Sequence, residues 1–353
     1  MQLSILLPTN RHGPATISRI AQVCSWASSD IEVIVRDNSG NPEKRALIAH
    51  FCDKHCRIIS VDPCSSLENY SEILRLASGD FVFYVADDDQ CFDRAVRALP
   101  NAIDFHGKDP SVAGFTGTYA LETPQGTAIV NYKNTDSADP ATRVAGYLNY
   151  PGPNMLFYSV VRRSLVERMT RCMNALPVFL SFHDQILCLL QLLNGKFVRI
   201  PHLLYAYDLG VWGEAESAQK CDAEFYRTAG LDLATNKLHW LICGFEGAAL
   251  VMNSDVLPEM TSAKRQPIAD LWFSMMFARF NNHVRLTFGS GLAATVDKAC
   301  DELRRATHQL TFEKILSEIC GILALSSQDR ARAYFDFWSE MISRHHPLLR
   351  KSA

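Results

Sequence analysis

The segment FVFYVADDDQ, residues 81–90, joins a run of apolar, strand-forming residues directly to three consecutive carboxylates. Neighbouring carboxylates repel one another at neutral pH, so three in a row require a compensating cation or several hydrogen-bond donors. The apolar run predicts a buried strand at 81–85. Asp87, Asp88 and Asp89 therefore stand at the carboxyl end of a predicted strand.

Alternating strand and helix patterns precede this segment. The strand patterns lie at residues 2–7, 31–35 and 57–61. The helical patterns lie at residues 13–27, from Pro42 onward, and at 66–77. Strands rich in Val, Ile and Phe that alternate with helices indicate a parallel sheet covered on both faces. The first part of the chain is thus predicted to be a doubly wound α/β domain.

Polar clusters follow three of these strands. They are Pro8, Thr9, Asn10 and Arg11 after the first strand, Asp37 to Ser39 after the second, and Asp87 to Asp89 after the fourth. In doubly wound sheets, ligands bind outside the carboxyl ends of the strands, where the strand order reverses. We therefore expect the three clusters to converge on one crevice.

The rest of the chain divides into a mixed region and a helical one. The mixed region contains a predicted strand pair at 111–132, a helix from Ser181 to Asn194 and a last strand from Lys196. From about 215 onward, helical patterns follow one another almost without interruption and predict five or six helices. We predict two domains, at residues 1–212 and 213–353.

Composition and charge exclude several classes of protein. The net charge is −3 and no basic stripe is present, which argues against a nucleic-acid partner. The N-terminal apolar run is too short for a signal peptide, and no uninterrupted apolar run has the length of a membrane span. These features predict a cytoplasmic protein. The basic segment 344–351 leaves peripheral contact with the inner face of the membrane open.

The cysteines fit reduced thiols better than a disulfide framework. There are 11, an odd number, and they are scattered through the chain. One group gathers at His50, Cys52, His55, Cys56 and Cys64. A zinc site there is an alternative to ordinary buried thiols, although the paired CxxC spacing is absent.

The aspartate triplet carries the main chemical hypothesis. Carboxylates that supply only oxygen ligands favour Mg²⁺ or Mn²⁺ over zinc, and such a cation commonly bridges protein carboxylates to substrate phosphates. The chain has neither GxxxxGK[ST] nor GxGxxG, so a cation and side chains must neutralise a diphosphate. The alternative is that the aspartates cap the helix predicted at 92–105.

The chain resembles the family 2 glycosyltransferases of the GT-A fold, which are inverting enzymes that use nucleotide-diphosphate sugars. The resemblance lies in SILLPTNRHG, EVIVRDNSGN, ASGDFVFYVADDDQ, GPNMLFYSVVRR, FHDQILCLLQLLNGKFVRIP and LLYAYD, across about residues 2–210. It implies a Rossmann-like GT-A sandwich, to which the helical region is appended. The helical region lies outside this resemblance.

The resemblance implies donor-binding roles for several positions. Pro8 and Thr9 match the loop that borders the nucleotide, and Asn10 and Arg11 continue that loop. Asp37 matches the acid that pairs with the base, usually uracil, through a ring N–H. The alternative for Asp37 is a residue that shapes the turn before Gly40.

Further positions concern the diphosphate and the metal ion. Asp87 and Asp89 match the two acids of the DxD motif, the first facing ribose or metal and the second ligating the metal. A shift of one residue in this match would give either role to Asp88. The remaining candidates are two residues of the preceding helix and one of the last strand: Asn69 and Arg75 near the diphosphate, and His202 as a third metal ligand or a structural residue.

The acceptor side is implied by a later motif. Asp184 matches the catalytic base, which removes the proton of an acceptor hydroxyl as it attacks the anomeric carbon. His183 stands where the family usually has Glu, and this departure concerns acceptor contacts. An alternative is that Asp184 forms a capping box with Ser181. Weaker acceptor-side or sheet-edge candidates are Asn154, Arg162 and Arg163.

The prediction is a glycosyltransferase that depends on Mn²⁺ or Mg²⁺. It would move a sugar from a nucleotide-sugar donor, a UDP-sugar by preference, to a glycan, glycolipid or protein acceptor, with inversion. Two alternatives remain open: a sugar-1-phosphate nucleotidyltransferase, whose Gly-rich first loop is not found in PTNRHG, and a non-catalytic module of the same fold. A homodimer through the helical region is a further expectation.

Overall fold

The fold is described from a computed structural model that covers residues 2–123, 125–149, 154–209, 215–253, 256–257, 260–282, 291–305 and 311–345. Most of the basic segment 344–351, and Pro124 within the predicted strand pair 111–132, lie outside the described residues. The chain divides into two compact units. The first comprises Met1–Asn174 and Gln191–Val211, and the second Ala175–Leu190 and Trp212–Ala353.

The first unit contains a nine-stranded mixed sheet in the order β3-β2-β1-β4-β8-β6-β9-β5, with β7 paired to β6. Its strands are β1 (Leu3–Thr9), β2 (Ile31–Asp37), β3 (Cys56–Ser60), β4 (Phe81–Tyr84), β5 (Gln90–Cys91), β6 (Val112–Thr123), β7 (Gly126–Val130), β8 (Val160–Arg162) and β9 (Lys196–Asp208). The four strands predicted before the aspartates are confirmed, as is the strand pair β6–β7. Strand β5, of two residues, was not predicted.

Strands β1 to β4 are parallel neighbours, with β1 between β2 and β4. The residues of β2 are buried along its whole length, as expected of a central strand with both faces covered. The register pairs Thr9 with Asp37, so the last residues of β1 and β2 lie side by side. This register brings the predicted ligand edge together.

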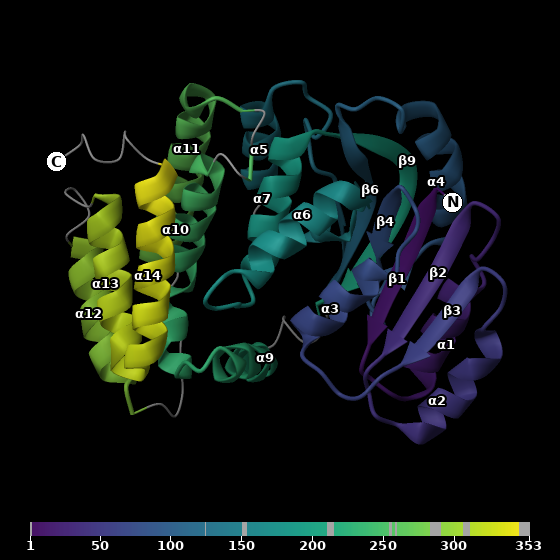
Figure 1. Ribbon diagram of the computed structural model, residues 1–353, viewed down its shortest axis with the longest axis horizontal. Helices are drawn as coiled ribbons and strands as arrows, with labels where there is room; N and C mark the ends of the chain where they lie inside the picture. Colours follow the sequence, from purple (N-terminus) through teal and green to yellow (C-terminus); the bar gives the residue numbers. More distant parts are fainter. Residues whose placement is uncertain are drawn as a thin grey trace. The chain divides into compact units, whose positions relative to one another are not determined.

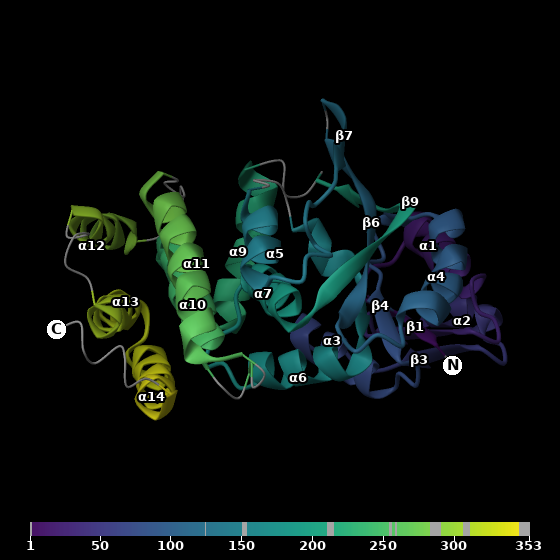
Figure 2. The same ribbon diagram turned by 90° about the horizontal axis from the view of Figure 1, so that it is seen from above.

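Helices cover both faces of the sheet. They are α1 (Pro14–Cys24), α2 (Pro42–Ile48), α3 (Ser66–Arg75), α4 (Asp93–His106), α5 (Pro140–Leu148) and α6 (Arg163–Asn174). Figure 2 shows α1 and α4 on one side of the sheet and α3 and α6 on the other. The contacts agree, because Trp26 donates its indole N–H to Asp93 and Ser71 donates to Asn174. Prolines at the first position of α2 and α5 fix the helix starts, as predicted for Pro42.

Glu32, near the start of β2, links β1 and the turn before β4 at the edge of the sheet opposite the aspartates. Its Oε1 accepts hydrogen bonds from the hydroxyl of Ser4, from the amide and hydroxyl of Ser78, and from the amide of Gly79. A Cβ at Gly79 would lie 2.7 Å from the Ser4 amide nitrogen, so only glycine fits this turn. Burial alone would raise the pKa of Glu32, but the hydrogen bonds from Ser4 and Ser78 lower it below its usual 4.5.

We expect Glu32→Gln to lower the free energy of unfolding by about 1–3 kcal/mol at pH 7, because a neutral amide oxygen accepts these hydrogen bonds more weakly than a carboxylate and the amide NH2 group cannot accept from Arg57. The ionised Glu32 stabilises the fold above about pH 4.5, and this contribution is lost as the pH falls through its lowered pKa. Urea unfolding of the two proteins should therefore differ at pH 7 and converge at acidic pH, below the lowered pKa of Glu32. The exposed Glu43→Gln should match the wild type at both. A Glu32→Gln variant as stable as the wild type at pH 7 would contradict this account.

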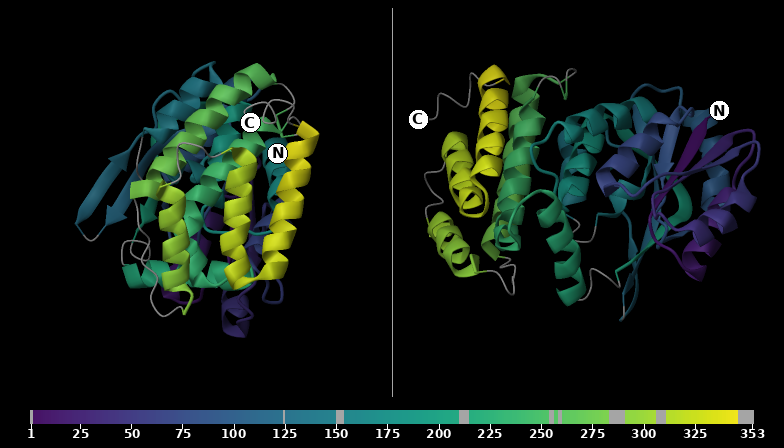
Figure 3. Two further views of the ribbon diagram at one scale, coloured as in Figure 1. Left: turned by 90° about the vertical axis from the view of Figure 1, so that its left-hand side faces the viewer. Right: turned by 60° about the horizontal axis from the view of Figure 1, so that its bottom comes forward.

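The second unit is helical among its described residues. Its helices are α9 (Ala215–Thr228), η3 (Leu233–Leu238), α10 (His239–Met252), α11 (Ser262–Asn282), α12 (Ala293–Arg305), α13 (Phe312–Ser326) and α14 (Gln328–His345), with most of α7 (His183–Asn194). Figure 1 labels α10 to α14 and Figure 3 shows them from two further sides. The prediction of a helical C-terminal region is confirmed.

Glycines let α10 and α11 approach closely. A Cβ at Gly247 would lie 2.2 Å from the Trp272 indole nitrogen, and one at Gly244 would lie 2.9 Å from Cβ of Met276. The Trp272 indole donates to the carbonyl of Cys243 at 3.0 Å, which satisfies its buried N–H. Trp272, Met276 and Phe280 are fully buried, so this aromatic face of α11 belongs to the core. No helix among the described residues has both the length and the apolar character of a membrane span.

The structure describes the cysteines and the segment for which a zinc site was the alternative. All 11 cysteines are free thiols. Among the described residues, no group of three or more His, Cys, Asp or Glu side chains is arranged to hold a metal ion, and this includes the segment from His50 to Cys64. Cys56 is buried, and a hydrogen bond with Cys24 lowers the pKa of Cys56.

Candidate functional site

The three polar clusters at the strand ends are joined by direct contacts. The hydroxyl of Thr9, the last residue of β1, donates to Asp87 Oδ2 at 2.5 Å. Asp87 lies three residues after the end of β4. The residue directly after β4, Val85, still donates its amide to the Leu6 carbonyl of β1. The structure thus brings together the ends of β1, β2 and β4, as their placement in a parallel sheet predicted.

Arg11 lies between two of the aspartates. Its Nη1 is 2.6 Å from Asp87 Oδ1, and its Nη2 is 2.7 Å from Asp88 Oδ2. The side chain of Asp87 is 3% exposed, whereas those of Asp88 and Arg11 are 40% and 51% exposed. One guanidinium therefore compensates two carboxylates, and it does so from the solvent side.

The charges in this group shift one another's ionisation. Burial lowers the pKa of Arg11, but the neighbouring charges of Asp88 and Asp87 outweigh it and raise that pKa overall. Burial has the largest effect on Asp88 and raises its pKa. The charge of Arg11 lowers this pKa and the repulsion of Asp87 raises it, so that it stays raised overall. The pair of carboxylates thus depends on a nearby cation.

Asp89 points to a different part of the unit. Its Oδ2 accepts from the Tyr205 hydroxyl at 2.8 Å and its Oδ1 from the Asp208 amide at 3.1 Å, both on β9. Burial and the charge of Asp88 raise the pKa of Asp89 to about 7. Tyr205 also accepts a hydrogen bond from the Ala86 amide, so it fixes the loop on both sides of the triplet. The sequence does not indicate this role of Tyr205, because LLYAYD has the pattern of an ordinary strand.

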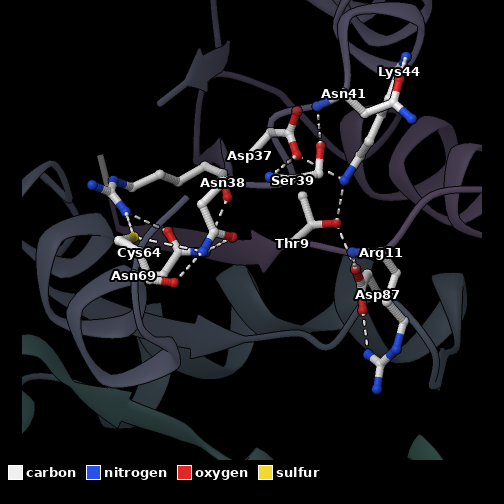
Figure 4. A network of polar contacts seen from close by, with 11 residues as sticks. Thr9, Arg11, Asp37, Asn38, Ser39, Asn41, Lys44, Cys64, Asn69 and Asp87 are labelled. Atoms are coloured by element: carbon white, nitrogen blue, oxygen red, sulfur yellow. Dashed lines mark hydrogen bonds and ion pairs between the residues drawn. The ribbon is translucent and has the colours of Figure 1, made fainter. Parts of the chain in front are cut away.

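Lys44 is a buried member of the site that the sequence did not suggest. Its Nζ lies 2.8 Å from Asp37 Oδ1 and donates to the Thr9 hydroxyl at 2.7 Å. The Lys44 and Asp37 side chains are 1% and 2% exposed. Figure 4 shows Lys44 reaching from α2 toward both partners. Because Lys44 can only donate, the Thr9 hydroxyl accepts from it and directs its own hydrogen to Asp87.

Asp37 also shapes the turn that follows β2. Its Oδ1 accepts from the Ser39 amide at 3.1 Å, the side-chain to backbone bond of an Asx turn. This is the geometry predicted by the alternative in which Asp37 shapes the turn before Gly40. Both Lys44 and Ser39 use Oδ1, so Oδ2 is the oxygen through which Asp37 would accept from a base.

A second buried network extends from β2 to α3. Arg36 donates to Asn69 Oδ1, and Asn69 donates to Asn38 Oδ1 at 2.9 Å. Asn38 in turn donates to the Cys64 carbonyl at 2.8 Å. Asn69 is 3% exposed, so this predicted site residue orders the loops after β2 and β3 from within the unit (Figure 4).

The carboxylate oxygens of this site are ligands that a hard divalent cation prefers, but some of them are already in contact with Arg11. Asp87 and Asp88 already direct one oxygen each to a single positive group, the guanidinium of Arg11. Mg²⁺ in proteins is commonly held by one or two carboxylates together with substrate phosphates and water, so two converging carboxylates fit such an ion. No third His, Cys, Asp or Glu among the described residues completes a cluster, since Asp89 is held by Tyr205.

The remaining predicted residues lie apart from this network. His202 is half-buried in the middle of β9 and joins no metal-binding group within the part of the chain that the structure describes. Pro8 pairs in register with Arg36, and Asn10 is exposed. The others contact backbone or neighbouring side chains: Arg75 with Glu72, Asn154 with Tyr147, Arg162 with the carbonyls of Gly107 and Val112, and Arg163 with that of Gly79.

Asp184 belongs to the second unit. It is the second residue of α7, is half-buried, and its Oδ1 accepts from the Gln185 amide at 2.7 Å. Ser181 donates its hydroxyl to Asp222 at 2.8 Å and lies two residues before the helix begins. Catalysis and helix capping both stay predictions for Asp184.

His183 is part of the core of the second unit. It is fully buried, and the rings of Phe179 and Phe182 stack on it. Its Nδ1 accepts from the Leu180 amide at 2.8 Å, and its Nε2 lies 2.9 Å from Oε2 of the buried Glu246 on α10. His183 thus anchors the start of α7 from inside, and it offers no surface to an acceptor.

Part of the first unit matches a known protein family in sequence. Residues 4–167 match the family model described as Glycosyl transferase family 2, and the matched range ends before the helical unit. No curated protein matches the chain in sequence.

Solved structures extend the likeness in fold to nearly the whole chain. S. aureus TarS 1–349 has a TM-score of 0.54 and 14% identity, over 98% of this chain and 91% of that chain. The same protein in complex with UDP-GlcNAc has a TM-score of 0.52 and 14% identity, over 98% and 92%. The GT-A fold with a helical C-terminal part is thereby confirmed.

Proposed function

Because residues 4–167 match glycosyl transferase family 2, we propose that the chain is a metal-dependent glycosyltransferase that uses a UDP-sugar. One observation carries the proposal. An unbroken path of polar contacts runs from Asp37 through Lys44 and Thr9 to Asp87 and Arg11, at the carboxyl ends of three parallel strands. A nucleoside diphosphate has a base at one end and charged phosphates at the other, which matches the two ends of this path.

In this proposal, the donor lies across the path. Asp37 accepts the ring N–H of uracil through Oδ2, while Lys44 holds the other oxygen. Asp87 and Asp88 hold Mg²⁺ or Mn²⁺, with Asp89 as a further ligand once it leaves Tyr205. The bound cation neutralises the charge that develops on the leaving diphosphate. The complex of TarS with UDP-GlcNAc supports the choice of a UDP-sugar.

The acceptor chemistry falls to Asp184. A carboxylate at the start of a helix is held in a fixed direction and can take the proton of an acceptor hydroxyl as the new glycosidic bond forms. Attack from the face opposite the diphosphate inverts the anomeric carbon. The acceptor is proposed to be a glycan, glycolipid or protein hydroxyl, and dimerisation and membrane contact stay predictions.

A donor-hydrolysis screen tests this function. The protein is incubated with UDP-, GDP-, ADP- and dTDP-sugars in the presence of Mn²⁺, and release of the nucleoside diphosphate is measured. We expect turnover of at least one UDP-sugar, its loss on addition of EDTA, and a fall of at least about 100-fold in Asp87→Asn, because one fixed ligand of the charge-neutralising ion is lost.

The control is Asp80→Asn, an exposed aspartate directly before β4 at the opposite edge of the sheet. It should leave the rate unchanged. Turnover that persists undiminished in EDTA would overturn the metal dependence, and absence of turnover with every nucleotide sugar would count against a transferase.

A further inference from the structure

Arg11 is both tightly paired with the aspartates and exposed to solvent. It compensates two carboxylates with both arms of its guanidinium, at 2.6 Å and 2.7 Å, yet half of its side chain is exposed. It lies in the loop between β1 and α1, so its side chain can leave without breaking a helix or strand. Its partner Asp87, in contrast, is held in place by Thr9.

A divalent cation and the guanidinium need the same oxygens. Asp87 Oδ1 and Asp88 Oδ2 both face Arg11, and these are the oxygens that converge on one positive charge. A guanidinium and a divalent ion within a few ångströms of each other repel strongly where one carboxylate is nearly buried. The cation can therefore take these ligands only when Arg11 gives them up.

A diphosphate supplies the released guanidinium with a new partner. Arginine presents a planar fork that matches phosphate oxygens in pairs, and the chain has no glycine-rich phosphate loop to neutralise a diphosphate by backbone amides. Exchange of Arg11 from the carboxylates to the diphosphate leaves each of these groups beside a positive charge: the carboxylates beside the divalent ion, and the diphosphate beside both the ion and Arg11. Neither the cation alone nor the diphosphate alone achieves this.

We propose that Arg11 is an internal cation that competes with the divalent ion for Asp87 and Asp88 and moves to the diphosphate when the donor binds. Arg11 thereby makes binding of metal and donor mutually dependent and disfavours binding of the metal alone. This inference rests on the proposed function, since it presupposes a metal ion and a nucleoside diphosphate at the same strand ends.

The consequence is a gain of metal affinity from loss of a basic residue. Arg11→Met removes the competitor but keeps the two carboxylates, so Mn²⁺ should bind to the free protein about fivefold or more tightly than in the wild type. In the wild type, UDP should raise the affinity for Mn²⁺, and Mn²⁺ should raise the affinity for UDP by the same factor. That factor should be smaller in Arg11→Met. Arg11→Lys, which keeps the charge without the fork, should lie between the two.

The experiment is a titration of Mn²⁺ into the full chain, with and without UDP, followed by the electron paramagnetic resonance signal of free Mn²⁺. The matched control is Arg97→Met, which removes the same charge from an exposed position on α4. Thermal unfolding of each variant checks that it is folded. No sugar acceptor or turnover is needed.

The outcomes separate this inference from the function on which it rests. Tighter binding of Mn²⁺ in Arg11→Met than in both the wild type and Arg97→Met supports the competition. Equal or weaker binding in a folded Arg11→Met shows that Arg11 only orders the carboxylates, and overturns the inference while metal dependence stands. Wild-type protein that binds no Mn²⁺ even with saturating UDP overturns both.

Discussion

Replacing Lys44 by methionine is expected to lower the free energy of unfolding by about 3–5 kcal/mol, the typical cost of removing one partner of a buried ion pair. Methionine fills much of the same space but leaves the Asp37 carboxylate, 2% exposed, without its cation. It also removes the donor that orients the Thr9 hydroxyl toward Asp87. Urea unfolding, followed by tryptophan fluorescence and by circular dichroism, measures the loss.

Two further variants show whether the pair is the cause. The exposed Lys54→Met should unfold like the wild type. Adding Asp37→Asn to Lys44→Met should restore part of the loss, because the amide carries no charge that needs compensation. If Lys44→Met is as stable as Lys54→Met, the pair of Lys44 with Asp37 does not hold the strand ends together.

The second large effect concerns catalysis. Asp184→Asn should lower kcat by about 10²–10⁴-fold, the usual contribution of a positioned general base. The asparagine oxygen can still accept the hydrogen bond from the Gln185 amide, so α7 should begin as before. The affinity for UDP and the urea unfolding midpoint should therefore stay at wild-type values. Steady-state kinetics with the donor found by the screen measure kcat.

The matched control is Asp270→Asn, on the exposed side of α11 in the same unit. It should leave kcat, UDP affinity and stability unchanged. A wild-type kcat in Asp184→Asn would remove this residue from the reaction. A loss of stability equal to that of a core variant would assign it a structural role instead.

The sequence was sufficient for the first half of the sheet because β1, β2 and β4 are apolar and buried along nearly their whole length. Leu3–Thr9 and Ile31–Asp37 each end in polar residues, and parallel strands place their carboxyl ends at one edge. The contact of Thr9 with Asp87 follows from this arrangement. Burial pattern and strand order together were enough to locate the candidate site.

The sequence could not reveal Lys44 or Tyr205, because their roles come from contacts between distant segments. Lys44 stands in the first turns of α2, where lysine normally faces solvent, and only the register of Thr9 with Asp37 places two acceptors beside it. Tyr205 is one of several apolar or aromatic residues of β9, and its link to Asp89 spans 116 residues. Nothing in the local pattern distinguishes either residue.

The grouping of the helices was likewise hidden in the sequence. Residues Ala175–Leu190, placed by the sequence in the first domain, group with the helical unit. The segment ILCLLQLL of α7 is apolar except for Gln191, so its pattern indicates burial without indicating a partner. The buried pair of His183 and Glu246 on α10 provides that partner. The domain boundary near residue 212 stays a prediction.

Diffraction from crystals soaked with UDP and Mn²⁺, recorded where manganese scatters anomalously, tests the central claim most directly. We predict an anomalous peak about 2.1 Å from a carboxylate oxygen of Asp87 or Asp88 and from a diphosphate oxygen, with Arg11 turned onto the diphosphate. UDP bound with no peak at these aspartates, and Arg11 still between them, would contradict it.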